Sequence, residues 1–450
     1  MPKEEGGLRM KFYGRDDELR ELRRIRESSL GSAKFTVVTG RRRVGKTELL
    51  EKALNDGTSP YLYLLVTERA EKDLCSIFQE EAQKVITQPI LGSVERFGQL
   101  FEIIMAYSVQ VPLTLVIDEF QDFDKIDRGI FGDMQGVWDR YHGKAKLNLV
   151  VCGSVNRMMN KIFFDDSQPL YGRDTGRLRI ASFSTALVKN ILRDYDEKAT
   201  NRDLLALWAM TGGVARYVEL FMDAGAWTRK SMLETVFSIS SSYIDEGRVS
   251  LNREFGKDFG VYFSILSAIA SGRTSFSEIY NVIGKDVGGQ LTRLETYYAF
   301  IAKVCPAYEM PSTRNCLYRI DDCFFRFWFR FVYKYMHLVE QRKFAGLVEL
   351  VEKDLDSFLG VSLEHYFRTK LLEDDSYTRA ANWWNRKGEN EIDLVCENEF
   401  KETVDFFEVK LDARRYDESV LRSKVEAFLR KHPDKRRADS RMGLLSVDDM

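Results

Sequence analysis

Residues Gly40 to Thr47, with the sequence GRRRVGKT, have the types and spacing of a loop that binds phosphate groups. Its glycines let the backbone approach phosphates closely, so that backbone N–H groups and the start of the next helix face the anionic charge. In such a loop Lys46 reaches the β- and γ-phosphates, and Thr47 ligates Mg²⁺. The pattern predicts binding of ATP and Mg²⁺ through Gly40, Arg41, Arg42, Arg43, Val44, Gly45, Lys46, Thr47 and Glu48.

Two acids follow a second apolar run, LVIDEF, and supply chemistry that suits the loop. The apolar residues place Asp118 at the carboxyl end of a strand, where open α/β sheets bind ligands. We predict that Asp118 holds Mg²⁺ through water and that Glu119 orients and activates the attacking water. The agreement of the two motifs disfavours a chance match in a Gly/Arg-rich turn, and equally a strand end with ordinary capping acids.

Phosphoryl transfer needs further polar groups beside Lys46. Ser154 ends the run VVCGS and is predicted to contact the γ-phosphate or the attacking water; the alternative is a simple helix cap. Arg173 and Arg177, in QPLYGRDTGR, are predicted arginine fingers that act across a subunit boundary or after closure, and the alternative is a surface salt bridge. Arg216, in GGVARYVEL, is a further candidate for a lid sensor.

A second set of acids lies near the C-terminus, in EIDLVCENEFKETVDFFEVKL. Residues i and i+2 of a strand share one face, so Glu408 and Lys410 are expected to point the same way. Asp393, on the neighbouring strand, is predicted to form a Mg²⁺ site with Glu408, while Lys410 positions or activates water. This chemistry suits phosphodiester hydrolysis. A solvated strand face and an intact but inactive fold stay open as alternatives.

The elements that must position these residues alternate between apolar runs and helical patterns, which implies a parallel sheet covered on both faces. A helical stretch from Ser184 to Phe255 suits a lid, and residues 258–320 show three helices and a hairpin in a winged-helix pattern. Strands are predicted at 35–40, 61–66, 113–120 and 147–154, and again in YTRAANWW, EIDLVCE and VDFFEVKL, before a last helix at 418–431.

Composition limits the partners. The net charge of −2 gives no global attraction to nucleic acid, so DNA contact needs a local basic face. Two such faces are the third winged-helix helix and the stretch from Arg422 to Arg437; for each the alternative is a solvated helix face. Trp383 and Trp384 could stack on bases, and the alternative is core packing. The residues that the third helix offers are Lys285, Gln290, Thr292 and Arg293.

The six cysteines lie far apart without a CxxC pair, and the four histidines are scattered. This disfavours a zinc ribbon, a histidine metal cage and a disulfide framework. The start, MPKEEGGLRM, lacks the apolar segment of a signal peptide, and no apolar run approaches the ~20 residues that span a bilayer. We expect a protein of the reducing cytoplasm without a membrane span.

Several stretches, in order, resemble the archaeal-type ATPases of the AAA+/STAND group: FYGRDDELREL, GRRRVGKTELL, LTLVIDEFQ, VVCGS, PLYGR and TGGVARY. The downstream YRIDDCFFRFWFRFV and EIDLV…FFEVK resemble the associated C-terminal domain DUF234, so the resemblance covers nearly the whole chain. It implies an α/β fold: a P-loop NTPase domain with a parallel sheet, a helical lid, a winged helix and a small α/β domain like PD-(D/E)xK nucleases. The implied boundaries are 11–180, 181–256, 257–335 and 345–450.

The resemblance also implies roles for single residues. Phe12, Gly14 and Arg15 would lie near the adenine, and Glu364, in SLEHYF, matches the frequent helix acid of the nuclease superfamily as a further metal ligand. Ala215 departs from the family, which often has proline after GG.

The predicted function is an ATPase whose nucleotide state controls a DNA-directed, nuclease-like end in DNA metabolism or defence against foreign DNA. The rival hypothesis is a nucleotide-dependent switch or scaffold that binds DNA or protein through a catalytically silent nuclease fold. AAA+ resemblance suggests rings and STAND resemblance monomers, so homo-oligomerisation stays open.

Overall fold

The computed structural model describes residues 9–55, 60–154, 157–255, 259–298, 300–310, 315–385, 390–437 and 439–450. The chain forms two compact units. Gly14–Ser182 is called the N-terminal unit below. Phe183–Met450, together with Met1–Tyr13, is called the C-terminal unit.

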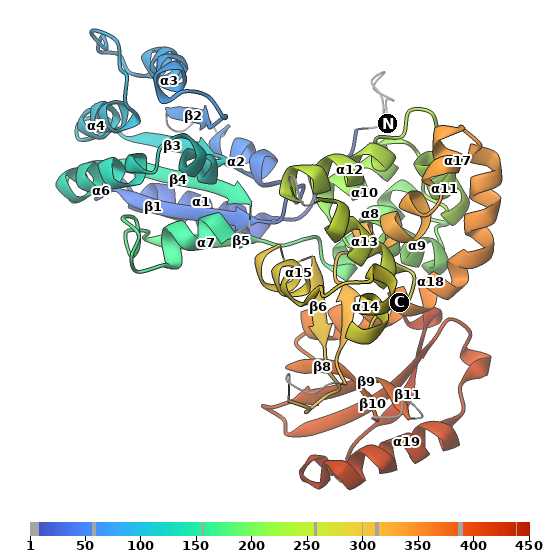
Figure 1. Ribbon diagram of the computed structural model, residues 1–450. Helices are drawn as coiled ribbons and strands as arrows, with labels where there is room; N and C mark the ends of the chain where they lie inside the picture. The colour runs from blue at the N-terminus through green and yellow to red at the C-terminus, as the bar shows by residue number, and fades with distance from the viewer. Residues whose placement is uncertain are drawn as a thin grey trace. The chain divides into compact units, whose positions relative to one another are not determined.

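The N-terminal unit is built around a parallel sheet with the strand order β2-β3-β4-β1-β5 among the described residues. The central strands are continuous apolar runs because both faces are covered, and every residue of β3 is buried. Figure 1 shows these strands and the surrounding helices in blue and green. The elements are α1 Asp16–Ser28, β1 Lys34–Gly40, α2 Lys46–Leu54, β2 Tyr61–Leu65, α3 Glu71–Val85, α4 Phe97–Ser108, β3 Leu113–Asp118, α5 Phe123–Ile126, α6 Gly129–Tyr141, β4 Leu147–Ser154, α7 Arg157–Phe164 and β5 Gly176–Ile180.

The predicted parallel α/β sheet is confirmed, but the sequence analysis missed one of its strands. β5 pairs with β1 at the edge of the sheet, where Val37 lies opposite Arg177 and Thr39 opposite Arg179. Along β5 exposed arginines alternate with more buried residues, so the segment lacks the apolar run of an interior strand. Edge strands commonly carry such charges, which discourage pairing with another chain.

The C-terminal unit begins with helices that share one hydrophobic core. Aromatic side chains fill much of it: Trp328, Tyr243 and Phe327 are fully or almost fully buried. The helices of this part are α8 Thr185–Tyr195, α9 Asn201–Thr211, α10 Ala215–Asp223, α11 Arg229–Val236, α12 Ser242–Phe255, α13 Phe259–Ala270, α14 Phe276–Ile283, α15 Gly288–Thr292, α16 Cys323–Phe327, α17 Met336–Glu340 and α18 Phe344–Glu373.

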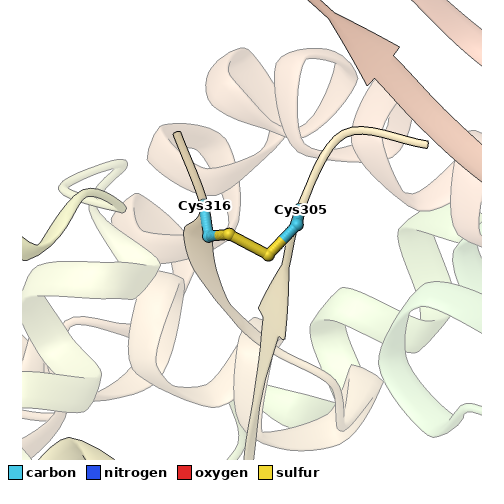
Figure 2. The surroundings of a disulfide bond; sticks show 2 residues. All are labelled: Cys305 and Cys316. Carbon is cyan, nitrogen blue, oxygen red and sulfur yellow. A yellow bond between two sulfur atoms is a disulfide. The ribbon is translucent and has the colours of Figure 1, made fainter. Parts of the chain in front are cut away.

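A hairpin of β6 (Ile301–Val304) and β7 (Leu317–Ile320) follows α15, as a winged-helix pattern requires. Val304 pairs with Leu317, so the next residues outward, Cys305 and Cys316, face each other and form a disulfide with a Cα–Cα distance of 4.2 Å (Figure 2). The sequence analysis disfavoured a disulfide framework and did not predict this one bond between the two cysteines. Their spacing in sequence gave no signal, because only the antiparallel register of the hairpin brings them together.

A small sheet with the order β11-β10-β9-β8 ends the C-terminal unit. Its strands are β8 Arg379–Trp384, β9 Glu391–Asn398, β10 Thr403–Lys410 and β11 Met442–Ser446. Helix α19 (Glu418–Lys431) contacts β9, β10 and β11 and runs along this sheet (Figure 1). Helix α18, 30 residues long, contacts both this sheet and the helices α8, α9 and α11.

β11 was not predicted, because its partner β10 lies far back in the sequence and joins it in parallel. Among the described residues, the structure contains no helix with the length and apolar character that a bilayer crossing needs.

One glycine tests the packing of the aromatic core. A Cβ on Gly247 of α12 would lie 2.3 Å from the Trp328 ring, which is fully buried and donates through Nε1 to the Ile244 carbonyl at 2.9 Å. We expect Gly247→Ala to destabilise the chain by about 1–3 kcal/mol, because the indole cannot move without breaking this packing. The control, Gly260→Ala in α13, enters open space and should be neutral or stabilising. Urea unfolding of the two variants compares them, and equal midpoints would contradict this account of the core.

Candidate nucleotide site and a second acidic site

The loop between β1 and α2 has the backbone shape that its glycines suggest. Gly45, immediately before α2, has φ 88°, and Arg43 also lies in the left-handed region with φ 70°. A Cβ on Gly40 would come within 2.6 Å of the Ile180 carbonyl oxygen, so this position needs glycine. The loop is thus held tightly between β1 and β5 while the first amides of α2 stay at its end.

The two polar residues that begin α2 are both engaged. Lys46 Nζ donates to the carbonyl oxygens of Gly40 at 2.9 Å and Arg41 at 3.1 Å, so its ammonium lies across the loop. Thr47 Oγ1 donates to Asp118 Oδ2 at 3.1 Å. The structure therefore brings together the loop and the acid that were predicted to share one site.

Asp118 ends β3 with only 6% of its surface exposed, and two hydroxyls satisfy its carboxylate. Besides Thr47, Tyr63 of β2 donates its O–H to Oδ2 at 2.5 Å, and burial together with this bond raises the pKa of Tyr63. Sequence reasoning missed Tyr63; its hydroxyl in the otherwise apolar run YLYLLV was the available signal.

Glu119 follows with φ 52°, a conformation that turns its carboxylate away from the strand direction. Gln121 Nε2 donates to Glu119 Oε2 at 2.6 Å and fixes the orientation of this group. Gln121 was not predicted either. A Cβ on Gly153 would meet Gln121 Oε1 at 2.3 Å, so β4 and this amide are in close contact.

The remaining predicted residues separate into two groups. Ser154 lies opposite Gly40 in the β1–β4 ladder, directly beside the loop. Arg173 and Arg177 lie near the amino end of β5, beside the amino end of β1, where the Thr175 N–H donates to the Phe35 carbonyl. There Arg173 pairs with Asp139 at 3.1 Å, and Arg177 pairs with Asp174. The phosphate loop follows the opposite, carboxyl end of β1. Neither arginine belongs to the nucleotide site of its own chain.

Of the residues that the family resemblance places near the adenine, Arg15 supports the loop. It donates to the Val44 carbonyl at 3.2 Å and to the Ala181 carbonyl at 2.6 Å. Gly14 precedes it with φ 63°. Phe12 belongs to the C-terminal unit, as does Arg216, which pairs there with Glu219 at 2.7 Å.

The second acidic site lies on the small sheet, where Asp393, Glu408 and Lys410 come together. Lys410 Nζ bridges the two acids, at 3.0 Å from Asp393 Oδ2 and 2.6 Å from Glu408 Oε2. Asp393 Oδ2 also accepts the backbone N–H of Val409 at 2.8 Å. Both acids are buried, with 8% and 4% of their surfaces exposed. Glu408 and Lys410 therefore point the same way, as the E-x-K spacing predicts. The carboxylates of this site are buried, so it is not a solvated strand face.

Three residues that the sequence analysis did not single out complete this site: Lys424, Asn382 and Arg368. Lys424 of α19 donates to Glu408 Oε1 at 2.5 Å. Asn382 of β8 donates to the Asp393 carbonyl at 2.7 Å and to Glu364 Oε2 at 3.3 Å, and it accepts from Arg368 Nη1 at 2.9 Å. Glu364, the predicted helix acid, thus lies at the border of the site on α18.

The enclosed charges shift each other's ionisation. Burial, and then the charges of Asp393 and Glu391, raise the pKa of Glu364 to about 8, so this acid is largely protonated at neutral pH. Burial and the neighbouring Glu408 raise the pKa of Asp393. Burial alone would also raise the pKa of Glu408, but hydrogen bonds from Lys410 and Lys424 lower it.

The two sites differ in how well they fit a divalent cation. Thr47 and Asp118 place a hydroxyl and a carboxylate oxygen side by side, which are ligands that Mg²⁺ prefers. At the second site the donors are also oxygens, but the Lys410 ammonium already lies between the carboxylates. Within the described ranges, no three His, Cys, Asp or Glu side chains gather as a metal cluster.

The proposed nucleic-acid faces differ in exposure. In α15 and on either side of it, Lys285, Thr292 and Arg293 are exposed, and Gln290 is half-buried. On α19, Arg422 pairs with Glu418, whereas Lys424 points to the acidic site. Trp383 and Trp384 are only 1% and 8% exposed and pack in the core, so the base-stacking hypothesis for them is wrong.

Two family models match the chain. Residues 12–221 match an ATPase domain predominantly from Archaea, and residues 328–421 match DUF234, described as archaeal and bacterial proteins of unknown function. An uncharacterized protein of Methanocaldococcus jannaschii is 27% identical over 409 residues, which cover 89% of this chain and 87% of that protein.

Solved structures resemble the chain at low sequence identity. A Walker-type ATPase of Pyrococcus abyssi is 19% identical with a TM-score of 0.51, over 71% of this chain and 96% of that one. The ORC2 protein of Aeropyrum pernix is 15% identical with a TM-score of 0.46, over 76% of this chain and 98% of that one.

The raised pKa of Glu364 predicts a pH-dependent stability. Because the folded state holds this proton more tightly than the unfolded chain, the stabilisation is complete below about pH 4.5 and is lost as the pH rises through about 8. The glutamine of Glu364→Gln cannot lose a proton. The melting temperature of this variant, relative to that of the wild type, should therefore rise as the pH increases from about 4.5 to about 8. Thermal unfolding in chelating buffer measures the difference, with exposed Glu349→Gln on the same helix as the control. A difference that stays constant with pH contradicts the prediction.

Proposed function

Because the chain carries an archaeal-type ATPase domain and a DUF234 region, we propose that it hydrolyses ATP at the loop Gly40–Thr47 and that nucleotide state controls a DNA-directed C-terminal part. The observation that supports the first step is the contact between Thr47 Oγ1 and Asp118 Oδ2 at 3.1 Å. This contact joins the end of the phosphate loop to the buried acid that ends β3, an arrangement that nucleotide hydrolysis needs.

The residues of this site have separate tasks. The loop amides and Lys46 bind the β- and γ-phosphates, for which the ammonium leaves its present bonds to Gly40 and Arg41. Thr47 and Asp118 would hold Mg²⁺, which when bound offsets phosphate charge. Glu119, oriented by Gln121, takes a proton from the attacking water, and Ser154 lies where it can contact the γ-phosphate.

An arginine finger would have to come from another copy of the chain. Arg173 lies beside the amino ends of the strands, whereas the phosphate loop follows the carboxyl end of β1. It can therefore reach a phosphate only across a subunit boundary. Such an arrangement needs a homo-oligomer at the moment of hydrolysis. We place the protein in the cytoplasm, in DNA metabolism or defence against foreign DNA.

For the C-terminal site we propose metal-dependent phosphodiester hydrolysis. Asp393 and Glu408 offer two buried carboxylates, Glu364 a third carboxyl nearby, and Lys410 an ammonium that can position water or stabilise charge. DNA is the proposed substrate, with the exposed face of α15 and the basic stretch Arg422–Arg437 as the contacts to phosphates.

We propose a switch or scaffold as the alternative function of the C-terminal site, because one observation favours it. Lys410 and Lys424 already neutralise Glu408, and Lys410 also contacts Asp393, so the acids are satisfied by the chain itself. A site that is satisfied in this way can serve binding alone.

The ATPase proposal makes a paired prediction. Lys46→Ala should lose nucleotide affinity, because the ammonium that meets the phosphates is gone. Glu119→Gln should still bind ATP but hydrolyse it about 100-fold more slowly, since an amide cannot accept the proton of the water. Fluorescent-nucleotide binding and phosphate release measure the two steps, with Arg202→Gln, an exposed change on α9, as the control. Normal turnover by Glu119→Gln removes Glu119 from catalysis.

The nuclease proposal is tested on supercoiled and linear DNA with Mg²⁺ or Mn²⁺. Asp393→Ala and Lys410→Ala should each reduce cleavage at least 100-fold, because each removes a group that contacts the proposed reaction centre. Circular dichroism of the same variants reports whether the C-terminal unit, which carries both substitutions, is folded. Absence of cutting by the wild type, alongside intact ATPase activity, favours the switch.

A further inference from the structure

Three arginines from separate elements share one region behind the acidic site. Arg319 comes from β7, Arg326 from α16 and Arg368 from α18. Arg326 Nη2 lies 3.6 Å from Cys323 Sγ, which in turn lies 3.6 Å from His365 Nδ1, one turn before Arg368 on α18. Their guanidinium charges act on one another: burial, and then the charges of Arg319 and Arg326 among others, lower the pKa of Arg368 to about 10.

Three N–H groups on two of these arginines have no acceptor in the described part of the chain. Arg326 is only 7% exposed, and its Nε and Nη1 have no hydrogen-bond partner; Nε of Arg319 has none either. The one remaining nitrogen of Arg326, Nη2, makes only long contacts, to Ser362 Oγ at 3.3 Å and to Cys323. A guanidinium enclosed in this way is costly unless it meets an acceptor.

Negative charge near the cluster is also insufficient. Asp321 lies 3.2 Å from Arg319, but more than half of its own side chain is exposed. Glu364, one turn before Arg368 on α18, accepts from Asn382, and among the described residues it forms no ion pair with any of the three arginines. Within the described ranges no carboxylate forms an ion pair with Arg326. Within the same ranges the three cations therefore form one ion pair, with the exposed Asp321.

We propose that Arg319, Arg326 and Arg368 form a binding site for a phosphate-type oxyanion. Guanidinium groups present paired N–H donors that match the oxygens of phosphate, and unmet donors on Arg319 and Arg326 are the groups such a ligand would take up. The site is separate from the phosphate loop, which belongs to the other unit, and goes beyond the ATPase function proposed above.

The position of the cluster suggests where the phosphate comes from, an assignment that rests on the proposed nuclease function. Arg368 and the acidic site contact the same side chain: Asn382 accepts from Arg368 and donates to the Asp393 carbonyl. Because Arg326 is almost fully enclosed, a nucleic-acid strand cannot run past it, and only a small oxyanion or the end of a strand is compatible with such a site. We therefore assign the source as a terminal phosphate, with free phosphate as the small-molecule alternative.

The test measures binding of inorganic phosphate by calorimetry, at constant ionic strength, to the full chain carrying Lys46→Ala. This background removes the phosphate loop as a second binding site. Arg319→Gln and Arg368→Gln should each weaken the affinity about tenfold or more, since each removes a charged hydrogen-bond donor. Arg202→Gln, an exposed arginine of the same unit, is the matched control and should leave the affinity unchanged.

The partly exposed Arg319 and Arg368 are used because Arg326→Gln could unfold the chain. Circular dichroism of each variant confirms folding before binding is compared. Millimolar or tighter phosphate binding that both substitutions weaken supports the site. Equal affinity in all variants, or no saturable binding by the parent, overturns it.

Oligonucleotides identify the source. Strands with a 5′- or 3′-phosphate should bind about tenfold more tightly than strands with hydroxyl ends, and Arg368→Gln should remove this preference. Binding of inorganic phosphate without such a preference leaves the oxyanion site in place and assigns it to a small ligand. Because Asp393→Ala is expected to abolish cleavage and keep phosphate binding, failure of the nuclease proposal can be told apart from failure of this one.

Discussion

A charged side chain that is removed from water must be neutralised or hydrogen-bonded nearby, and this constraint shapes both acidic sites of the chain. Asp118 is buried at the end of β3, and the hydroxyls of Thr47 and Tyr63 satisfy it from two other elements. Glu408 is equally buried, and Lys410 and Lys424 neutralise it. Because the partners come from distant parts of the sequence, each acid can be buried only after the surrounding strands and helices have assembled.

The same constraint explains which parts of the molecule could be predicted. The loop Gly40–Thr47 is local: its glycines, the apolar run before it and the helix after it occupy one short stretch, so fold and chemistry are read together. Asp393, Glu408 and Lys410 also follow from local patterns, because strand periodicity fixes which side chains share a face. Their meeting in one site needed only that the two strands be neighbours, which β9 and β10 are.

What the sequence does not reveal depends on contacts across long separations. Strands β5 and β11 lie at sheet edges, where most residues of each strand are only partly buried or exposed. Tyr63, Lys424 and Asn382 sit in ordinary strand or helix patterns, and only the assembled fold directs them to an acid. Cys305 and Cys316 meet because of the register of the β6–β7 hairpin, and the sequence alone does not show which residues of the two strands lie opposite each other.

Helix α18 connects these observations into one argument about the C-terminal part. It carries Glu364 toward the acids and Arg368 toward the arginines, and both side chains bind Asn382. The DUF234 match starts at Trp328, after Arg319 and Arg326, so the arginine cluster is completed by the hairpin and by α16, outside the matched segment. The β6–β7 hairpin therefore contributes a side chain to the surroundings of the acidic site. Burial and the charge of Arg319 lower the pKa of Arg368, whose guanidinium donates to Asn382. Asn382 in turn donates to the Asp393 carbonyl, so β7 is joined to the acidic site through two side chains of other elements.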